Sequence, residues 1–365
     1  MERVLAVGVA KEHAALDVLE IERRPVGPHD VYVRVLYCGV CHSDLHHGRS
    51  EWGRPKFPAV PGHEIIGQVV RVGSDVSKFR VDDTVGVGVF VDSCRHCSEC
   101  KDGQVQYCSG KRAGDLPGRC DTYGSPTPDP PGHTLGGYSQ AIVVDENYVL
   151  SIPPGLDLKR AAPLLCAGIT TYSAMRHYGV RKGDRIGVLG LGGLGHMAVK
   201  FGKAMGAHVT VLTRSSRKRD LAMKMGADDV IITEDEGDRF KAAQRSMDRI
   251  VDTVSARHDI DAYVNLLRVN GTLIMVGASP DPLTFRTFPL IMRRTSIGGS
   301  LVGGIAETQE MLQFCADHDI SCDVEVVPIA DVNKAWDRMV KGDVQFRFVI
   351  DVAGSLAKGT TINKA

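Results

Sequence analysis

Two patterns of hydrophobic and polar positions follow one another along this chain. In the first 150 residues, polar and apolar residues alternate with the two-residue period of strands, most clearly over 30–40 (DVYVRVLYCGV) and over part of 64–72 (EIIGQVVRV). Glycines and prolines separate these runs. The pattern predicts a compact β-rich sheet or barrel with long loops. It also predicts irregular structure over 109–133, which is rich in Gly, Pro and Asp.

From about residue 155 the pattern changes to short apolar runs separated by stretches with helical periodicity. Strands are predicted over 185–190, 208–213, 229–233, 248–254 and 271–276. Helices are predicted over 195–205, 216–225 and 260–267. Strands that alternate with helices are typical of a doubly wound parallel sheet, so the fold class is α/β.

The end of the chain returns to mixed structure. Two amphipathic helices and a terminal strand are predicted over 307–318, 331–341 and 346–352. The simplest organisation places a nucleotide-binding domain over 155–292. It is inserted into a discontinuous first domain made of 1–154 and 293–365.

Composition and charge narrow the functional classes. The chain has 365 residues, enough for two domains with a core each, and 44 Lys and Arg balance 44 Asp and Glu. A net charge of zero argues against a nucleic-acid or anionic-membrane partner. Charged residues interrupt the first 17 positions, and no stretch approaches the roughly 20 apolar residues of a membrane span. We therefore expect a cytoplasmic location, where the ten cysteines stay reduced.

Four cysteines lie within fifteen residues, in the pattern C-x2-C-x2-C-x7-C. They are Cys94, Cys97, Cys100 and Cys108. Such spacing is typical of a zinc site and favours it over the alternatives, unrelated packing cysteines or a disulfide cluster. Four thiolates close the tetrahedral shell and leave no position for substrate, so the predicted zinc is structural.

A glycine-rich loop follows the strand predicted over 185–190. It comprises Gly190, Leu191, Gly192, Gly193, Leu194 and Gly195. In a dinucleotide-binding loop the first glycine permits the tight turn, the next admits the pyrophosphate, and the last allows the helix to pack closely. The start of that helix offers free N–H groups to the phosphates. Strand, loop and helix occur here in the required order, so the sequence predicts a dinucleotide site.

The residues after the next strand discriminate between the two nicotinamide cofactors. An NAD site usually places a carboxylate there for the ribose 2′-hydroxyl, but none precedes Asp220. The segment instead reads Thr213, Arg214, Ser215, Ser216, Arg217, Lys218. Hydroxyls and cations suit a 2′-phosphate, so NADP is favoured. The alternative is that the basic run is only the solvated start of a helix.

A second group of zinc-binding residue types is scattered along the chain. It comprises Cys41, His63 and Cys166. Two thiolates and one imidazole are the ligands of a catalytic zinc that keeps one open position. From spacing alone a core histidine and a small buried cysteine explain His63 and Cys166 as well.

The chain resembles the zinc-dependent medium-chain alcohol dehydrogenases, most closely their cinnamyl alcohol dehydrogenase-like branch. The motifs that match, in family order, are CGVCHSDLH, VPGHEIIGQVVRVG, the four-cysteine pattern, HTLGGYS, APLLCAGITTY and GLGGLGHMAVKFGKAMGA. They occupy the first 207 residues. The resemblance implies a GroES-like catalytic domain, a Rossmann domain with the active site in the cleft between them, two zinc ions per chain and NADP. It also implies a homodimer and alcohol or aldehyde substrates.

The same resemblance implies roles for individual residues. Cys41, His63 and Cys166 would bind the catalytic zinc, with Glu64 as a nearby or interchanging ligand. Ser43 would hydrogen-bond the substrate oxygen, and His46, rather than the adjacent His47, would end the proton relay. Asp44 would orient a zinc-binding histidine. The residues implied to face the nicotinamide and its carboxamide are Thr170, Val276 and Gly277.

Two observations leave the substrate open, and three rival functions remain. The segment 109–123 is longer than the family pattern and adds Cys120, which we interpret as a surface thiol. Trp52 and Phe90 are candidate pocket aromatics, but core packing explains them nearly as well. The rivals are an NAD-linked polyol dehydrogenase, a zinc-free quinone-type reductase, and a zinc-lobe binding protein, meaning an interaction or nucleic-acid module that uses the four-cysteine unit alone.

Overall fold

The computed structural model describes residues 1–53 and 55–363. The chain forms two compact units, Met1–Cys166 with Gly303–Ala365, and Ala167–Val302. The sheet of the second unit reaches past the domain end expected at 292, because its sixth strand lies at Ser296–Gly299. The boundaries at 155 and 292 otherwise stay a prediction.

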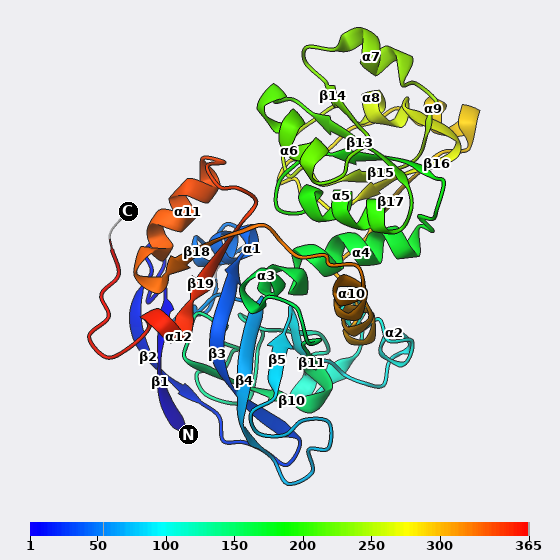
Figure 1. Cartoon of the computed structure of the whole chain (residues 1–365). Coiled ribbons are helices and arrows are strands. Elements are labelled where there is room, and N and C mark those ends of the chain that lie inside the picture. Colours follow the sequence, from blue (N-terminus) through cyan, green and yellow to red (C-terminus); the bar gives the residue numbers. More distant parts are fainter. Residues whose placement is uncertain (54, 364–365) are drawn as a thin grey trace. The chain divides into compact units, whose positions relative to one another are not determined.

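The first unit is built on a seven-stranded sheet with the order β11-β5-β4-β3-β19-β18, and β10 also pairs with β3 (Figure 1). Its strands are β3 (Asp30–Val40), β4 (Ile65–Val72), β5 (Thr84–Val87), β10 (Ala141–Asp145), β11 (Val149–Ser151), β18 (Val324–Pro328) and β19 (Arg347–Asp351). The strands predicted over 30–40, 64–72 and 346–352 are confirmed. β3 is buried along most of its length, and it lies inside the sheet, where it pairs with β4, β10 and β19.

Smaller elements complete this unit. β1 (Glu2–Gly8) and β2 (Asp17–Arg23) form an antiparallel pair. The helices are α1 (His42–Gly48), α2 (Ser98–Lys101), α3 (Leu158–Ala161), α10 (Ile305–Asp317), α11 (Val332–Val340) and α12 (Val352–Ser355). The amphipathic pattern of the last part is confirmed, since α11 buries Val332, Ala335 and Trp336 on one face.

The segment 109–133 is more ordered than the sequence suggests. β7 (Lys111–Arg112) pairs with β8 (Leu116–Pro117), and β9 (Cys120–Asp121) pairs with β6 (Phe90–Asp92). The interpretation of Cys120 as a surface thiol is wrong, because pairing with β6 leaves it 1% exposed. Phe90 is likewise buried in the core.

The second unit is a six-stranded parallel sheet with the order β14-β13-β12-β15-β16-β17, so the doubly wound architecture is confirmed (Figure 1). Its strands are β12 (Arg185–Leu189), β13 (His208–Thr213), β14 (Asp229–Ile232), β15 (Met247–Asp252), β16 (Leu267–Met275) and β17 (Ser296–Gly299). Its helices are α4 (Ala167–His177), α5 (Gly195–Ala204), α6 (Arg219–Lys224), α7 (Gly237–Ala242), α8 (Ile260–Val264) and α9 (Thr287–Arg293). The helix predicted over 260–267 is shorter because β16 begins at Leu267.

Order along the sheet decides which loops are neighbours. β12 pairs in parallel with both β13 and β15, and β15 pairs in parallel with β16. The loops that follow these strands therefore leave from one edge of the sheet, where open α/β sheets bind their ligands. Among the described residues, no helix combines the length and the apolar character that crossing a membrane requires.

Candidate metal centres and cofactor site

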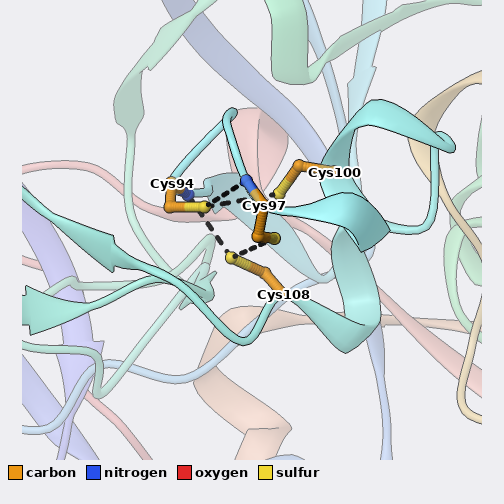
Figure 2. A group of neighbouring side chains, drawn as sticks. All are labelled: Cys94, Cys97, Cys100 and Cys108. Carbon is orange, nitrogen blue, oxygen red and sulfur yellow. Dashed lines mark hydrogen bonds between the residues drawn. The ribbon is translucent and has the colours of Figure 1, made fainter.

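The four clustered cysteines converge on one point (Figure 2). Cys94 Sγ lies 3.9 Å from Cys100 Sγ, and Cys97 Sγ lies 3.8 Å from Cys108 Sγ. Sulfurs bound to one tetrahedral zinc at about 2.3 Å are roughly 3.8 Å apart, so the spacing fits a zinc ion. Burial opposes ionisation of Cys94, but the backbone N–H groups of His96 and Cys97 lower its pKa to about 6. This favours the thiolate at Cys94, whereas burial raises the pKa of Cys100 and raises that of Cys108 to about 12.

The second ligand set also comes together, although its members are far apart in the sequence. The ligand atoms of Cys41, His63, Glu64 and Cys166 all lie within 4.8 Å of one another. Cys41 follows the end of β3 and His63 precedes β4, and the antiparallel pairing of these strands brings those two ends together. Cys166 arrives from the 3-10 helix Ala162–Leu165, with its Sγ 4.0 Å from Cys41 Sγ.

The chemistry of this set fits a metal ion. His63 Nδ1 lies 3.4 Å from Asp44 Oδ1, while His63 Nε2 is buried and has no hydrogen-bond partner among the described residues. The imidazole therefore keeps one ring nitrogen for a ligand, as zinc-binding histidines do. The pKa of Cys41 is well below its ordinary value, chiefly through the hydrogen bond from Cys166, with Arg347 and His63 contributing.

Asp44 is the carboxylate that orients this region. It is fully buried at the start of α1 and accepts hydrogen bonds from the N–H groups of Cys41 and Gly62, at 2.9 and 3.0 Å. Tyr138 donates its hydroxyl to the same side chain at 3.1 Å. These bonds fix the carboxylate beside His63, as the resemblance implies.

Glu64 pairs with a residue that sequence reasoning missed. The guanidinium of Arg347, on β19, donates to Glu64 Oε1, and both side chains are buried. Burial raises the pKa of Glu64 to about 7, although Arg347 favours the carboxylate. Glu64 Oε2 has no partner in the described part of the chain, so it is the oxygen left for a metal. The sequence carries no local signal for this pair, because 283 positions separate the two residues.

α1 carries the residues of the implied proton relay. Ser43 Oγ lies 3.6 Å from Cys41 Sγ, beside the second ligand set. His46 is partly exposed, its Nδ1 lies 2.5 Å from Glu51 Oε2, and its ring stacks on Trp52 at 4.8 Å. Glu51 is a second residue that sequence reasoning missed. Trp52 is 63% exposed, so core packing does not account for it.

His47 has a different environment from His46. Its ring lies 4.7 Å from the Tyr123 ring, and its Nε2 is buried without a described partner. Burial lowers the pKa of His47, so it stays neutral at physiological pH. A partly exposed histidine can exchange a proton with solvent and a buried neutral one is poorly placed to do so, which favours His46 for the relay.

In the second unit the glycine loop has the geometry that a dinucleotide requires. Gly190 has φ +86°, and a Cβ on Gly195 would lie 2.1 Å from the carbonyl oxygen of Gly190. A Cβ on Gly192 would meet no atom within 4 Å, so its surroundings are open to a ligand. The remaining members, Gly193 and Leu194, lead directly into α5. The first and last glycines are thus required by the turn, and the middle one leaves space for a phosphate.

The basic segment after β13 lies beside this loop. Lys218 Nζ donates to the carbonyl oxygen of Leu191 at 2.9 Å, while the Arg214 side chain is 80% exposed. Burial lowers the pKa of Lys218, and the charge of Arg214 adds to this effect. Thr213 is buried and its hydroxyl accepts from the N–H of Ser215 at 3.3 Å. These cations leave the same sheet edge as the glycine loop, which suits a phosphate on the ribose.

The residues implied to contact the nicotinamide lie on two different elements, the end of β16 and α4. The N–H groups of Val276 and Gly277 donate to the carbonyl oxygen of Asp252, at 2.9 and 3.0 Å. This holds the end of β16 beside β15 at the edge that carries the glycine loop. Thr170 is buried within α4. Its contact with a nicotinamide stays a prediction.

The chain is similar to known proteins in both sequence and structure. The family model of the alcohol dehydrogenase GroES-like domain matches residues 27–154, and that of the zinc-binding dehydrogenases matches 193–317. The aldehyde reductase YahK of Escherichia coli is 50% identical over 351 residues, covering 96% of this chain and 98% of that protein. The NADP-dependent alcohol dehydrogenase C 1 of Mycolicibacterium smegmatis is 48% identical, covering 97% and 99%.

Solved structures agree with these matches. A cinnamyl alcohol dehydrogenase from Sorghum bicolor superposes with a TM-score of 0.92 at 42% identity, covering 98% of this chain and 100% of that one. The cinnamyl alcohol dehydrogenase of Helicobacter pylori, solved in complex with NADP(H), has a TM-score of 0.88 at 38% identity, with 97% and 99% covered. The similarity therefore extends over both units.

Proposed function

The chain belongs to the zinc-containing medium-chain alcohol dehydrogenases, in their cinnamyl alcohol dehydrogenase-like branch, and from this premise we propose how its residues divide the work. It is an NADP-dependent alcohol dehydrogenase or aldehyde reductase. The observation that carries the assignment is the convergence of Cys41, His63, Glu64 and Cys166 at one buried point, in a chain that also carries an intact dinucleotide fold. A zinc-lobe binding protein and a zinc-free reductase have no use for this ligand set.

Cys41, His63 and Cys166 hold the catalytic zinc, and Glu64 is within reach as an interchanging ligand. Zinc supplies a Lewis acid that stabilises negative charge on the substrate oxygen during hydride transfer. A second zinc would be held by Cys94, Cys97, Cys100 and Cys108. Four thiolates complete its coordination shell, so this ion stabilises the segment 94–108.

The relay moves one proton between the substrate oxygen and solvent. Ser43 hydrogen-bonds that oxygen, and His46 exchanges the proton with water as general acid and base. Glu51 accepts from His46 Nδ1 and so leaves Nε2 free for the relay, while Trp52 holds the ring from one face. The partial exposure of His46 supports its exchange of this proton with solvent.

NADP(H) supplies the hydride, and the second unit binds it. Gly190, Gly192 and Gly195 shape the pyrophosphate site, with Gly193 and Leu194 starting the helix whose N–H groups face the phosphates. Arg214 and Lys218, with the hydroxyls of Thr213 and Ser215, bind the 2′-phosphate. Thr170, Val276 and Gly277 contact the nicotinamide end.

The substrate class is a primary alcohol or its aldehyde, aromatic (cinnamyl-type) or aliphatic. Steady-state rates with a panel of aldehydes, alcohols and polyols, each with NADPH and NADH, test this. We expect aldehyde reduction with NADPH to give the highest kcat/KM, with two zinc ions per chain by elemental analysis. A preference for polyols with NADH would favour the polyol dehydrogenase, and one zinc or none would overturn the proposed site.

We also propose a cytoplasmic homodimer. The dimer, though not the location, is supported by an apolar surface on α9, where Phe288, Ile291 and Met292 are each more than 60% exposed. It lies in the same unit as β17, the edge strand of the parallel sheet. Sedimentation at micromolar concentration should give twice the chain mass, and Ile291→Glu should give the monomer mass.

A further inference from the structure

Tyr123 reaches the candidate catalytic metal centre from the segment 109–133, which sequence patterning predicts to be irregular. It follows β9, and its ring lies between two imidazoles, 4.7 Å from His47 and 5.5 Å from His63 between ring centroids. Its hydroxyl oxygen lies 3.1 Å from His63 Nδ1. The ring nitrogen that faces away from the metal therefore has a second neighbour besides Asp44.

The Tyr123 oxygen is the closer of these two neighbours. Asp44 Oδ1 lies 3.4 Å from His63 Nδ1, which is longer than the 2.7–3.2 Å of an ordinary N–H···O bond. Asp44 already accepts from two backbone N–H groups and from the Tyr138 hydroxyl. Three of the roughly four acceptor positions of this carboxylate are thus occupied by donors other than His63.

We propose that Tyr123 is a positioning residue for the catalytic zinc. Its hydroxyl accepts the Nδ1–H of His63 and so holds that nitrogen from a second side, alongside the longer contact to Asp44 rather than in place of it. This arrangement fixes the His63 tautomer with the Nε2 lone pair towards the metal.

The backbone around Tyr123 is held firmly enough for such a role. The Thr122 hydroxyl donates to the carbonyl oxygen of Gly88, and the Thr122 N–H donates to that of Val89 at 2.8 Å. Gly124 follows with φ +77°, and a Cβ there would lie 2.6 Å from the His47 ring. The segment 109–133 therefore supplies a fixed side chain to the metal centre.

The inference rests on the proposed function, since it assumes that His63 binds zinc. It is tested in the zinc-loaded enzyme with Tyr123→Phe, which keeps the ring between the two histidines and removes only the hydroxyl. The readout is the rate at which each zinc is lost to a chelator, together with the visible spectrum of the cobalt-substituted enzyme. Tyr148→Phe is the matched control, because its hydroxyl lies 2.6 Å from Ser93 Oγ, beside the structural cysteines.

We expect Y123F to lose one of its two zinc ions about 10–100-fold faster than the wild type, with a changed cobalt spectrum. The second zinc should leave at the wild-type rate, and Y148F should not accelerate loss of the catalytic zinc. Wild-type release and an unchanged spectrum in Y123F would overturn the inference. If Y123F folds poorly, Y123L replaces it, and wild-type release there overturns the inference as well. A wild-type enzyme with only the structural zinc would instead overturn the proposed site.

Discussion

The carboxylate of Glu64 and the guanidinium of Arg347 form a buried ion pair at the candidate catalytic metal centre. Arg347 opens β19, which pairs with the end of β3 just before Cys41. The chain thus places one cation among two thiols and a carboxylate. The positive charge of Arg347 is stabilised by the negative charges of Glu64, Cys41 and Cys166, the groups that would also bind a zinc ion.

Replacing Arg347 by Met should destabilise the protein by about 3–5 kcal/mol, because Glu64 would remain buried without a counter-charge. Urea unfolding of the metal-free protein measures this loss without contributions from zinc affinity. Arg338→Met is the matched control, since its pairs with Glu325 and Asp343 are partly exposed and should contribute less than about 1 kcal/mol each. Equal losses in the two variants would contradict the role assigned to burial.

Replacing Glu51 by Gln should lower kcat about tenfold, the equivalent of one hydrogen bond of roughly 1.4 kcal/mol. The neutral amide would no longer hold the His46 tautomer, so proton release should slow and the pH dependence of kcat should change. Zinc content and the KM for NADPH should stay at wild-type values. Glu51→Asp is expected to recover part of the rate, whereas a loss of zinc would point to a structural role.

Replacing Arg214 by Ala should raise the KM for NADPH about 10–100-fold and change that for NADH little, because a charge-assisted contact to the 2′-phosphate contributes roughly 1.5–3 kcal/mol. Lys218→Ala should also raise the KM for NADPH more than that for NADH, with a smaller effect on both cofactors because Lys218 bonds the Leu191 carbonyl in the glycine loop. Arg217 is exposed and provides the control within the same basic run. If Arg214→Ala raised the KM for NADPH and for NADH equally, the proposal that this segment binds the 2′-phosphate of NADP would be wrong.

Cys120 should be inert to alkylation at pH values where an ordinary thiol reacts. Burial raises its pKa to about 11, whereas an unfolded cysteine titrates near 8.5. At pH 9 only about 1% of the folded protein carries the thiolate that reacts with iodoacetamide. Mass spectrometry of the peptide with Cys120 measures the rate, and the urea-unfolded chain is the control.

The same pKa difference makes a prediction for stability. Below about pH 8.5 both states hold the proton and Cys120 contributes nothing. Between that pH and about 11 only the folded state holds it, so folding becomes less favourable as the pH rises. Cys120→Ala should lessen the loss of stability between pH 8 and 10.5 in urea titrations. An identical pH dependence in both proteins would contradict the burial of this thiol.

Features that depend on short stretches of chain could be read from the sequence. Four cysteines within fifteen residues can meet without any help from distant segments, and their sulfurs do converge. The glycine loop needs only a strand before it and a helix after it, and both are present. The period of apolar residues likewise located the strands and helices of both units, because local backbone geometry sets that period.

Tertiary structure decided what surrounds these residues. Glu64 meets Arg347, and His63 meets Tyr123, only because β19 and β9 pair with strands far away in the sequence. Glu51 is close to His46 along the chain, yet its carboxylate reaches the ring only through the turn that follows α1. Spacing indicates which residue types can bind a metal or a phosphate. The partners that set their charge and orientation follow from long-range pairing and burial, which no local pattern encodes.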